Sequence, residues 1–268
     1  MNLENVSLAY FLPTGTIQKI LRAIAKGYGA KQVEQIDLTL PAADIQRKKE
    51  NQEELMILGV PVYEGRVSKT AIPRLKQLTA KNTPAVVVVM YGNRDFEDAL
   101  LELNDLALEL SFLPVAGGAF IGEHSFARED RPMANGRPDA QDIKAAMAFG
   151  SKIREKIKAL DSVDKAALIT PPGNTPYVEH DRRGMEDKAA STIDEDCTLC
   201  GECEPLCPVG AITIEQTVKT DSLACILCNA CVKNCPAGAR VVADPMINKV
   251  VSWVSKNFQD RREPEIFI

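Results

Sequence analysis

The chain has 268 residues and a formal net charge of −5, with 45% of the residues hydrophobic and 26% charged. This length is sufficient for one or two domains with buried cores, and the ordinary composition excludes collagen-like, low-complexity and wholly disordered proteins. The longest apolar run, 84–90, is too short to span a bilayer, and residues 1–6 lack the basic residues that begin a secretory signal. A soluble cytoplasmic protein is therefore expected.

The segment 1–160 alternates between strand and helix patterns. Residues 6–12 are apolar, a turn follows at 13–16, and apolar residues then recur at helical spacing as far as Gly27, which is expected to end the helix. Further strands are predicted at 33–40, 55–63, 85–90 and 113–121, and helices at 73–78, at 97–110 and from the N-cap Asp139 to 160. Five strands alternating with helices predict a doubly wound α/β sheet.

Three loops of this sheet are candidates for a binding site, because ligands bind beyond the carboxyl ends of parallel strands. The first, Pro13-Thr14-Gly15-Thr16, places hydroxyls and amides at a helix N-terminus, which suits a phosphate but is also an ordinary capping turn. The other two join a tyrosine to a glycine, as a site that clasps a planar ring would, although a single such tyrosine is usually a capping hydrophobe. These loops are Pro61-Val62-Tyr63-Glu64-Gly65-Arg66 and Tyr91-Gly92-Asn93-Arg94.

Residues 161–190 connect the sheet to the rest of the chain. Prolines and a glycine at 171–173, followed by Pro176 and Tyr177, predict an irregular strap packed against the sheet rather than a loose tether. The chain has two histidines, His124 and His180. His124 follows the fifth strand and could touch a ligand, but a structural loop histidine is the more common case.

All eight cysteines lie between 197 and 235, in two copies of the pattern C-x2-C-x2-C-x3-C-P, of which one begins at Cys197 and the other at Cys225. A thiolate at every third residue lets three sulfurs of one run reach three irons of one cube, while the fourth points to the other cube. The spacing therefore predicts two [4Fe-4S] clusters. The ligands are Cys197, Cys200, Cys203 and Cys235 for the first cluster and Cys225, Cys228, Cys231 and Cys207 for the second.

Zinc and disulfides are the other uses of cysteine to consider. Zinc sites usually pair two C-x2-C knuckles across a spacer, which three cysteines at two-residue gaps fit badly. The lack of an export signal disfavours disulfides. Small residues near the cysteines would let backbone amides approach cluster sulfides, namely Gly201, Gly210, Ala230 and Gly238.

The acidic excess of the chain is confined to the cysteine segment. Residues 191–245 contain eight acidic and three basic side chains, whereas the rest of the chain has 29 of each sign. This argues against a nucleic-acid surface and favours redox protein partners with a basic docking face, although acidity for solubility alone would explain it too. Apolar residues at helical spacing from 247 to 258 predict a docking helix.

Two parts of the chain resemble known electron-transfer proteins. Residues 192–244 resemble the bacterial two-cluster ferredoxins. The whole chain is similar to the flavodoxin–ferredoxin fusion family of anaerobic microbes. The similarity rests on the three loops, on Asp98, on the sequence Ala119-Phe120-Ile121-Gly122-Glu123-His124-Ser125 and on the two C-P motifs that follow. The resemblance implies a flavodoxin-like FMN-binding domain at 1–160, a strap at 161–190, a two-[4Fe-4S] ferredoxin domain at 191–245, and a docking helix and tail at 246–268. It also implies one FMN, held by Pro13, Thr14, Gly15, Thr16, Tyr63, Gly65, Tyr91, Gly92, Asn93 and Arg94.

The phosphate loop departs from the flavodoxin pattern Ser/Thr-x-Thr-Gly-x-Thr, because Leu12 and Ile17 stand where hydroxyl residues are usual. FMN binding would then rest on Thr14, Thr16, the loop amides and the helix dipole, so weakened or lost binding is expected. Glu64 lies in a loop that faces the flavin in flavodoxins. Its negative charge is expected to lower the potential of a ring that becomes anionic on full reduction.

The leading interpretation is an electron-transfer flavo-iron-sulfur protein that carries low-potential electrons between the two clusters and FMN and on to a redox partner. One alternative is an FMN-dependent reductase, fed by the clusters, whose small-molecule substrate binds near Arg94, Glu123 and His124. The other is a ferredoxin with a flavin-free docking domain. No nucleophile–base pair or carboxylate dyad suggests further chemistry.

Overall fold

The computed structural model describes residues 1–41, 54–180 and 184–268. Five parallel strands form the main sheet: β1 (Asn5–Tyr10), β2 (Gln32–Asp37), β3 (Glu54–Tyr63), β5 (Thr83–Tyr91) and β6 (Phe112–Ile121). Their spatial order is β2-β1-β3-β5-β6, and all four neighbouring pairs are parallel. This is the strand order of the flavodoxin-like doubly wound fold, so the predicted fold class is confirmed.

Two short strands extend this sheet and were not predicted. β4 (Arg66–Val67) pairs antiparallel with the end of β3. The turn between them has φ of 57° at Glu64 and 77° at Gly65, the left-handed pair that a tight two-residue hairpin requires. β11 (Glu265–Phe267) pairs antiparallel with β6 and closes that edge of the sheet.

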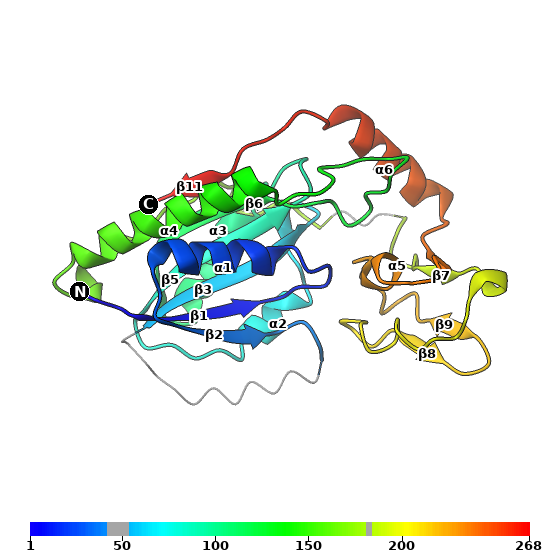
Figure 1. The fold of residues 1–268 in the computed structure, drawn as a ribbon, viewed down its shortest axis with the longest axis horizontal. Coiled ribbons are helices and arrows are strands. Elements are labelled where there is room, and N and C mark those ends of the chain that lie inside the picture. The colour runs from blue at the N-terminus through cyan, green and yellow to red at the C-terminus, as the bar shows by residue number, and fades with distance from the viewer. Residues whose placement is uncertain (42–53, 181–183) are drawn as a thin grey trace.

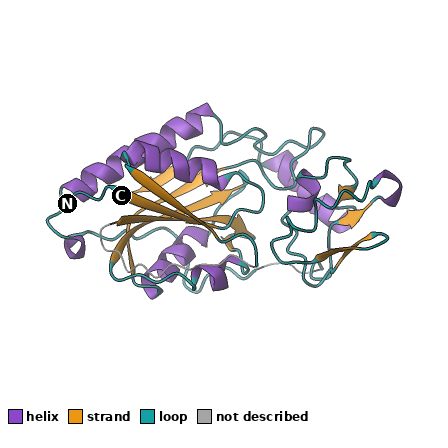
Figure 2. Cartoon of the chain, turned by 60° about the horizontal axis from the view of Figure 1, so that its bottom comes forward, coloured by secondary structure: helices purple, strands orange, loops and turns teal. Residues whose placement is uncertain are grey.

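Helices cover both faces of the sheet (Figure 2). α1 (Ile17–Tyr28) and α4 (Ala140–Lys158) pack on one face, and α2 (Ala71–Leu75) and α3 (Ala99–Glu109) on the other. Successive β3 residues alternate between the two cores, with Leu55 and Ile57 on the α1 side and Met56 and Leu58 on the α3 side. Burial on both faces explains why β3 and β5 are nearly continuous apolar runs, whereas the edge strand β2 is polar and mostly exposed.

The expectation that Gly27 ends α1 is wrong. The helix continues to Tyr28 and ends at Gly29, which has the left-handed φ of 77° that a helix C-terminus favours. Gly27 instead lies where α1 touches α4, and a Cβ atom there would be 1.9 Å from the carbonyl oxygen of Met147. Gly150 of α4 makes the equivalent close contact with α1, since a Cβ atom there would lie 2.1 Å from the carbonyl oxygen of Ile24.

Asp139 begins α4 as the sequence predicts. Its side chain accepts hydrogen bonds from the backbone amides of Gln141 and Asp142, and the Asp142 carboxylate accepts one from the Asp139 amide. This reciprocal capping satisfies amide groups that would otherwise lack partners. Within the described ranges, none of the helices combines the length and the apolar character that crossing a bilayer requires.

In the described residues 159–180, which follow α4, the one regular element is a 3-10 turn, η1 (Val163–Lys165), and this segment is attached to α3. The Asp98 carboxylate accepts hydrogen bonds from the backbone amides of Asn174, at 2.8 Å, and Val178, at 2.6 Å. The hydroxyl of Tyr177 donates to Asp105 at 2.5 Å. These bonds position the strap along the sheet domain.

The cysteine module lies beyond the carboxyl ends of the sheet strands (Figure 1). It contains two small sheets, β7 (Ser191–Thr192) with β10 (Arg240–Val241) and β8 (Ile212–Ile214) with β9 (Val218–Thr220), and two short helical segments, η2 (Asp194–Asp196) and α5 (Ala230–Lys233).

α6 (Pro245–Asn257) leads the chain from this module back to the sheet domain (Figure 1). Its buried residues Ile247, Val251 and Val254 belong to the apolar core of the module. Beyond the helix, the side-chain amide of Asn93 donates to the carbonyl oxygens of Phe258, at 2.8 Å, and Asp260, at 2.9 Å. The chain then pairs with β6 as β11, so the cysteine module is attached to the sheet domain at both of its ends.

Candidate functional site

Two small cavities in the cysteine module divide the eight cysteines into two groups of four. Each group takes three cysteines from one run of the repeat and the fourth from the other run. This is the grouping that the spacing predicts. One cavity is lined by Cys197, Cys200, Cys203 and Cys235, and the other by Cys207, Cys225, Cys228 and Cys231.

The backbone turns in the same way around both cavities. Leu199 and Leu227, which occupy the same position in the two copies of the repeat, have left-handed φ values of 51° and 55°. Gly201 and Asn229, another pair of equivalent positions, have φ of 87° and 61°. Alternation of right- and left-handed residues directs successive backbone amides toward one centre, an arrangement that suits an anion such as an iron–sulfur cluster. The repeat in the sequence is therefore a repeat in local structure.

Each of the two groups of four cysteines has the number of ligands that one [4Fe-4S] cluster needs. All eight cysteines are free of disulfide bonds. In the parts of the chain that the structure describes, no three His, Cys, Asp or Glu side chains converge as ligands of a single metal ion. Zinc would draw its sulfurs to about 2.3 Å from one centre, whereas a four-iron cube holds its ligands further apart around a larger body.

A larger cavity of about 270 Å³ separates the sheet domain from the cysteine module. On the sheet side it is lined by the loops that follow β1, β3, β5 and β6, and on the other side by the module and by α6. Seven of the ten predicted FMN residues line it: Thr14, Thr16, Tyr63, Gly65, Tyr91, Gly92 and Arg94. Across from them lie Ile226 and Leu227 and the α6 residues Ile247, Val250, Val251 and Val254.

The other three predicted FMN residues do not line this cavity. Pro13 and Gly15 belong to the turn before α1, where Gly15 is exposed with φ of 83° and open space surrounds its Cβ position. Asn93 is 3% exposed, and its side chain binds the chain after α6 rather than the cavity. Their roles in binding stay predictions.

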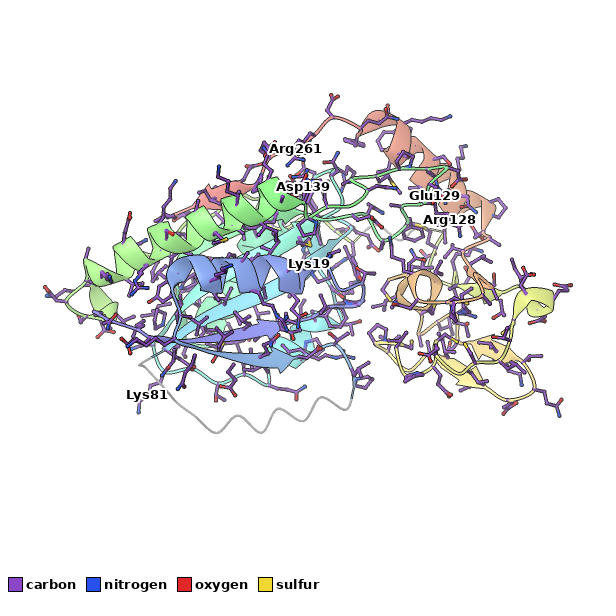
Figure 3. All side chains as sticks on the ribbon, viewed as in Figure 1. Lys19, Lys81, Arg128, Glu129, Asp139 and Arg261 are labelled. Atoms are coloured by element: carbon purple, nitrogen blue, oxygen red, sulfur yellow. The ribbon has the colours of Figure 1, made fainter. Side chains whose placement is uncertain are left out.

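The N-terminus of α1 offers an anion site next to the cavity. Thr16 makes no side-chain cap, the first turn contains no acidic residue, and Lys19 lies in that turn at the end of the helix that faces the module (Figure 3). The first-turn amides at this helix end and the helix dipole favour a phosphate here. Leu12 and Ile17 stand where flavodoxins usually have hydroxyl residues. Ile17 is 2% exposed and packs in the core, and the Leu12 amide donates to the hydroxyl of Thr39 at 2.9 Å.

Tyr63, at the end of β3, lies near Cys228 of the second group of cysteines. Burial raises the pKa of its hydroxyl well above the usual value, and the nearby Cys228 acts in the same direction. Glu64, the next residue, also lines the cavity, and His180 Nδ1 lies 3.5 Å from its Oε2. The expected effect of Glu64 on a flavin potential stays a prediction.

A buried ion pair holds the hairpin that carries Tyr63. The Arg66 guanidinium donates from Nε and from a terminal nitrogen to the Glu102 carboxylate, at 2.8 and 2.7 Å. Glu102 also accepts a bond of 2.8 Å from the Val67 amide, and the ring of Tyr177 lies under the guanidinium, 4.6 Å from its carbon. Arg66 thus holds the β3–β4 loop through contacts with α3 and with the strap. The sequence gives no signal for Glu102, which is one of several acidic residues on α3.

His124 lies at the same cavity in a neutral form. Its ring packs on Gly92, where a Cβ atom would be 2.2 Å from the ring, and Nδ1 accepts a hydrogen bond from the Phe126 amide at 3.2 Å. Burial, followed by the positive charges of Lys233 and Arg94, lowers the pKa of His124 to about 4. Because Nδ1 accepts a bond, the proton resides on Nε2.

Residues 196–240 match the 4Fe-4S dicluster domain family. No curated protein sequence matches the chain. Among solved structures, the chain is similar to a flavodoxin from the domain Archaea, with 16% identity over 57% of this chain and 99% of the flavodoxin and a TM-score of 0.41. It is also similar to oxidised flavodoxin 1 from Bacillus cereus, with 14% identity over 59% and 99% of the two chains and a TM-score of 0.40. The strand order and the dicluster match together are consistent with a flavodoxin–ferredoxin fusion.

Proposed function

We propose that the chain is an electron-transfer flavo-iron-sulfur protein in which two [4Fe-4S] clusters exchange electrons with FMN. The observation that carries this proposal is the cavity shared by the two domains. Tyr63 and Tyr91 line it from the sheet, and Ile226 and Leu227, which lie between the ligand positions Cys225 and Cys228, line it from the module. A flavin bound there would be adjacent to the second cluster, so transfer between them needs no diffusive encounter.

The residues at the cavity suggest how each group is held. Thr14, Thr16 and the first-turn amides of α1 would bind the phosphate, while Tyr63 and Tyr91 would flank the ring. FMN supplies one- and two-electron chemistry and each cluster one-electron chemistry when bound. The apolar side chains of α6 line the far side of the cavity.

We further propose that protein partners exchange electrons at the first cluster. Cys200 is exposed, and the acidic segment η2 precedes this run of cysteines at the end of the module away from the sheet (Figure 1). α6 and the module together wall the flavin cavity, which leaves the first cluster as the accessible end of the route. A partner with a basic surface would be steered to this acidic end.

The first test measures iron, acid-labile sulfide and flavin per chain in protein purified without oxygen. The expected result is about eight irons and one FMN. Thr16→Ala is expected to weaken FMN binding without changing iron content, whereas Thr213→Ala, at an exposed position on β8, leaves both unchanged. Eight irons without flavin, even after FMN is added, would contradict the proposal and favour the flavin-free docking domain.

The second test measures the rate at which the reduced protein transfers electrons to a basic cytochrome c used as a probe. We expect the rate to fall as salt increases, because screening weakens steering. Neutralising Glu195 and Asp196 together should slow the reaction at low salt. The matched control neutralises Glu129 and Asp130, exposed acids on the loop after β6. Equal effects of the two sets of substitutions would contradict the docking site.

A further inference from the structure

The two halves of the cysteine repeat differ in charge at one buried position. After the fourth cysteine, one half continues Pro208-Val209-Gly210-Ala211-Ile212 and the other Pro236-Ala237-Gly238-Ala239-Arg240. Ile212 is 3% exposed and Arg240 is 2% exposed. A guanidinium therefore occupies, in one half only, the position where the other half has a hydrocarbon side chain.

Arg240 reaches the second group of cysteines directly. One terminal nitrogen donates to the Thr192 hydroxyl at 2.6 Å, and the other donates to the Ala190 carbonyl at 3.1 Å and to the Thr220 hydroxyl at 2.8 Å. That second nitrogen also lies 3.7 Å from the sulfur of Cys231. Within the described ranges, Nε is buried without a hydrogen-bond partner. Among the described residues, all of the partners of Arg240 are hydroxyl, carbonyl or thiol groups, and none is a carboxylate.

A buried guanidinium surrounded by such partners needs an anion nearby. Arginine stays protonated in proteins, and burying its charge without a counter-charge is strongly unfavourable. Arg240 lines the cavity of the first group of cysteines as well as contacting Cys231 of the second. Clusters held by four thiolates in each cavity would supply negative charge on both sides of it.

We propose that Arg240 is a buried counter-charge that sets the cluster potentials and raises that of the second cluster above that of the first. Reduction adds negative charge to a cluster, so a nearby positive charge favours the reduced form. A hydrogen bond donated to a ligand sulfur acts in the same direction. Arg240 makes such a contact only with Cys231, a predicted ligand of the second cluster. Electrons then move downhill from the first cluster to the second, toward the cavity, a direction that rests on the function proposed above.

The test is a redox titration of the full chain without oxygen, followed by electron paramagnetic resonance. Arg240→Ile copies the other half of the repeat, Arg240→Lys keeps the charge, and Lys219→Met removes an exposed charge from the same module. Two midpoint potentials are expected in the wild type. In Arg240→Ile the higher one should fall more than the lower one, so that they converge, and this shift should persist at high salt because a buried charge is poorly screened. Arg240→Lys should keep part of the separation, and Lys219→Met should keep all of it.

An Arg240→Ile protein that keeps the wild-type separation of potentials overturns the proposal. If that variant fails to assemble clusters, Thr220→Val decides the question, because it removes a bond that orients the guanidinium and leaves the charge in place. Its higher potential should then fall, and an unchanged pair of potentials again overturns the proposal. Flavin is measured on the same samples. Its absence would contradict the proposed function, while the two cluster potentials would still test Arg240.

Discussion

A largely buried ion pair between Arg66 and Glu102 stabilises the hairpin from β3 to β4. Arg66 and Glu102 have side-chain exposures of 15% and 10% and make a two-bond contact. Glu102→Gln would leave the guanidinium buried without its counter-charge, and removing one partner of a buried pair costs roughly 3 kcal/mol or more. We expect the urea midpoint of the sheet domain to fall and FMN binding to weaken. The control is Glu109→Gln on the same helix, where the ion pair with Lys76 is exposed; equal midpoints in the two variants would contradict this account.

His124 gives a pH dependence whose sign follows from its burial. An unfolded histidine binds a proton near pH 6.5, whereas His124 does so only near 4. Between these values the unfolded state binds more protons, so stability falls as pH falls, by at most about 1.4 kcal/mol per pH unit. Below the lower value no further loss arises from this residue.

Nuclear magnetic resonance of labelled histidine can test this pKa, because the chain has two histidines and His180→Gln leaves one. We expect His124 to titrate near 4. His124→Gln should also reduce the acid dependence of the thermal unfolding midpoint between pH 6.5 and 4. A resonance of His124 that titrates near the ordinary value would contradict its buried, neutral state.

At the scale of elements, the contact between α1 and α4 is set by two glycines. Gly27→Ala would force a Cβ atom against the Met147 carbonyl of α4. Overpacking of this kind costs about 1–3 kcal/mol, which exceeds the gain of about 1 kcal/mol from the better helix propensity of alanine. The urea midpoint should therefore fall. Lys152→Ala, at an exposed position on α4, should leave it nearly unchanged; a stabilised Gly27→Ala protein would contradict the close approach of the helices.

The elements that sequence alone predicts are the long, strongly patterned ones. Four of the five parallel strands follow from apolar runs, the exposed edge strand β2 from a weaker alternation, and helix α4 from its cap Asp139. β4 and β11 have two and three residues, too few to show a period. β4 pairs with the end of β3 that extends past its neighbours, and β11 pairs with the open edge of β6. The role of Gly27 cannot be predicted locally, because nothing near it in the sequence shows that a second helix, from a distant part of the chain, approaches it.

In the site too, features that depend on local sequence can be predicted, and features that depend on contacts with distant segments cannot. The grouping of the cysteines follows from local spacing, and the loops converge because parallel strands end at one edge. The hydroxyl of Thr39 beside Leu12, the carboxylate of Glu102 behind Arg66 and the apolar wall of α6 come from distant segments. Each depends on the tertiary fold, which the sequence pattern does not encode locally.

At the scale of the whole molecule, the cysteine module has a small core in which cysteines are themselves packing residues. Cys203, Cys207 and Cys231 are buried together with Ile212 and Val251. Ligands that also fill the core link cluster binding to folding, because the side chains packed around them depend on the positions at which the cluster holds them.

Removal of iron by a chelator is therefore expected to loosen this module selectively. Backbone amides of 191–244 and of α6 should exchange hydrogen faster, while those of β5, which is buried along its whole length, should not change. Hydrogen exchange measured by mass spectrometry, before and after chelation under anaerobic conditions, provides the test. Equal acceleration in β5 would show that the two domains unfold as one unit.

The return of the chain as β11 has a consequence for biosynthesis. All eight cysteines precede α6, and Glu265–Phe267 come after it, so a ribosome completes every cluster ligand before it makes the strand that covers β6. Until then β6 presents an uncovered edge, and such edges template aggregation. α6 packs on the module, and β11 follows it by only a few residues. Iron supply during translation would thus govern how quickly the nascent sheet is protected, and iron-starved cells should accumulate this chain in aggregates.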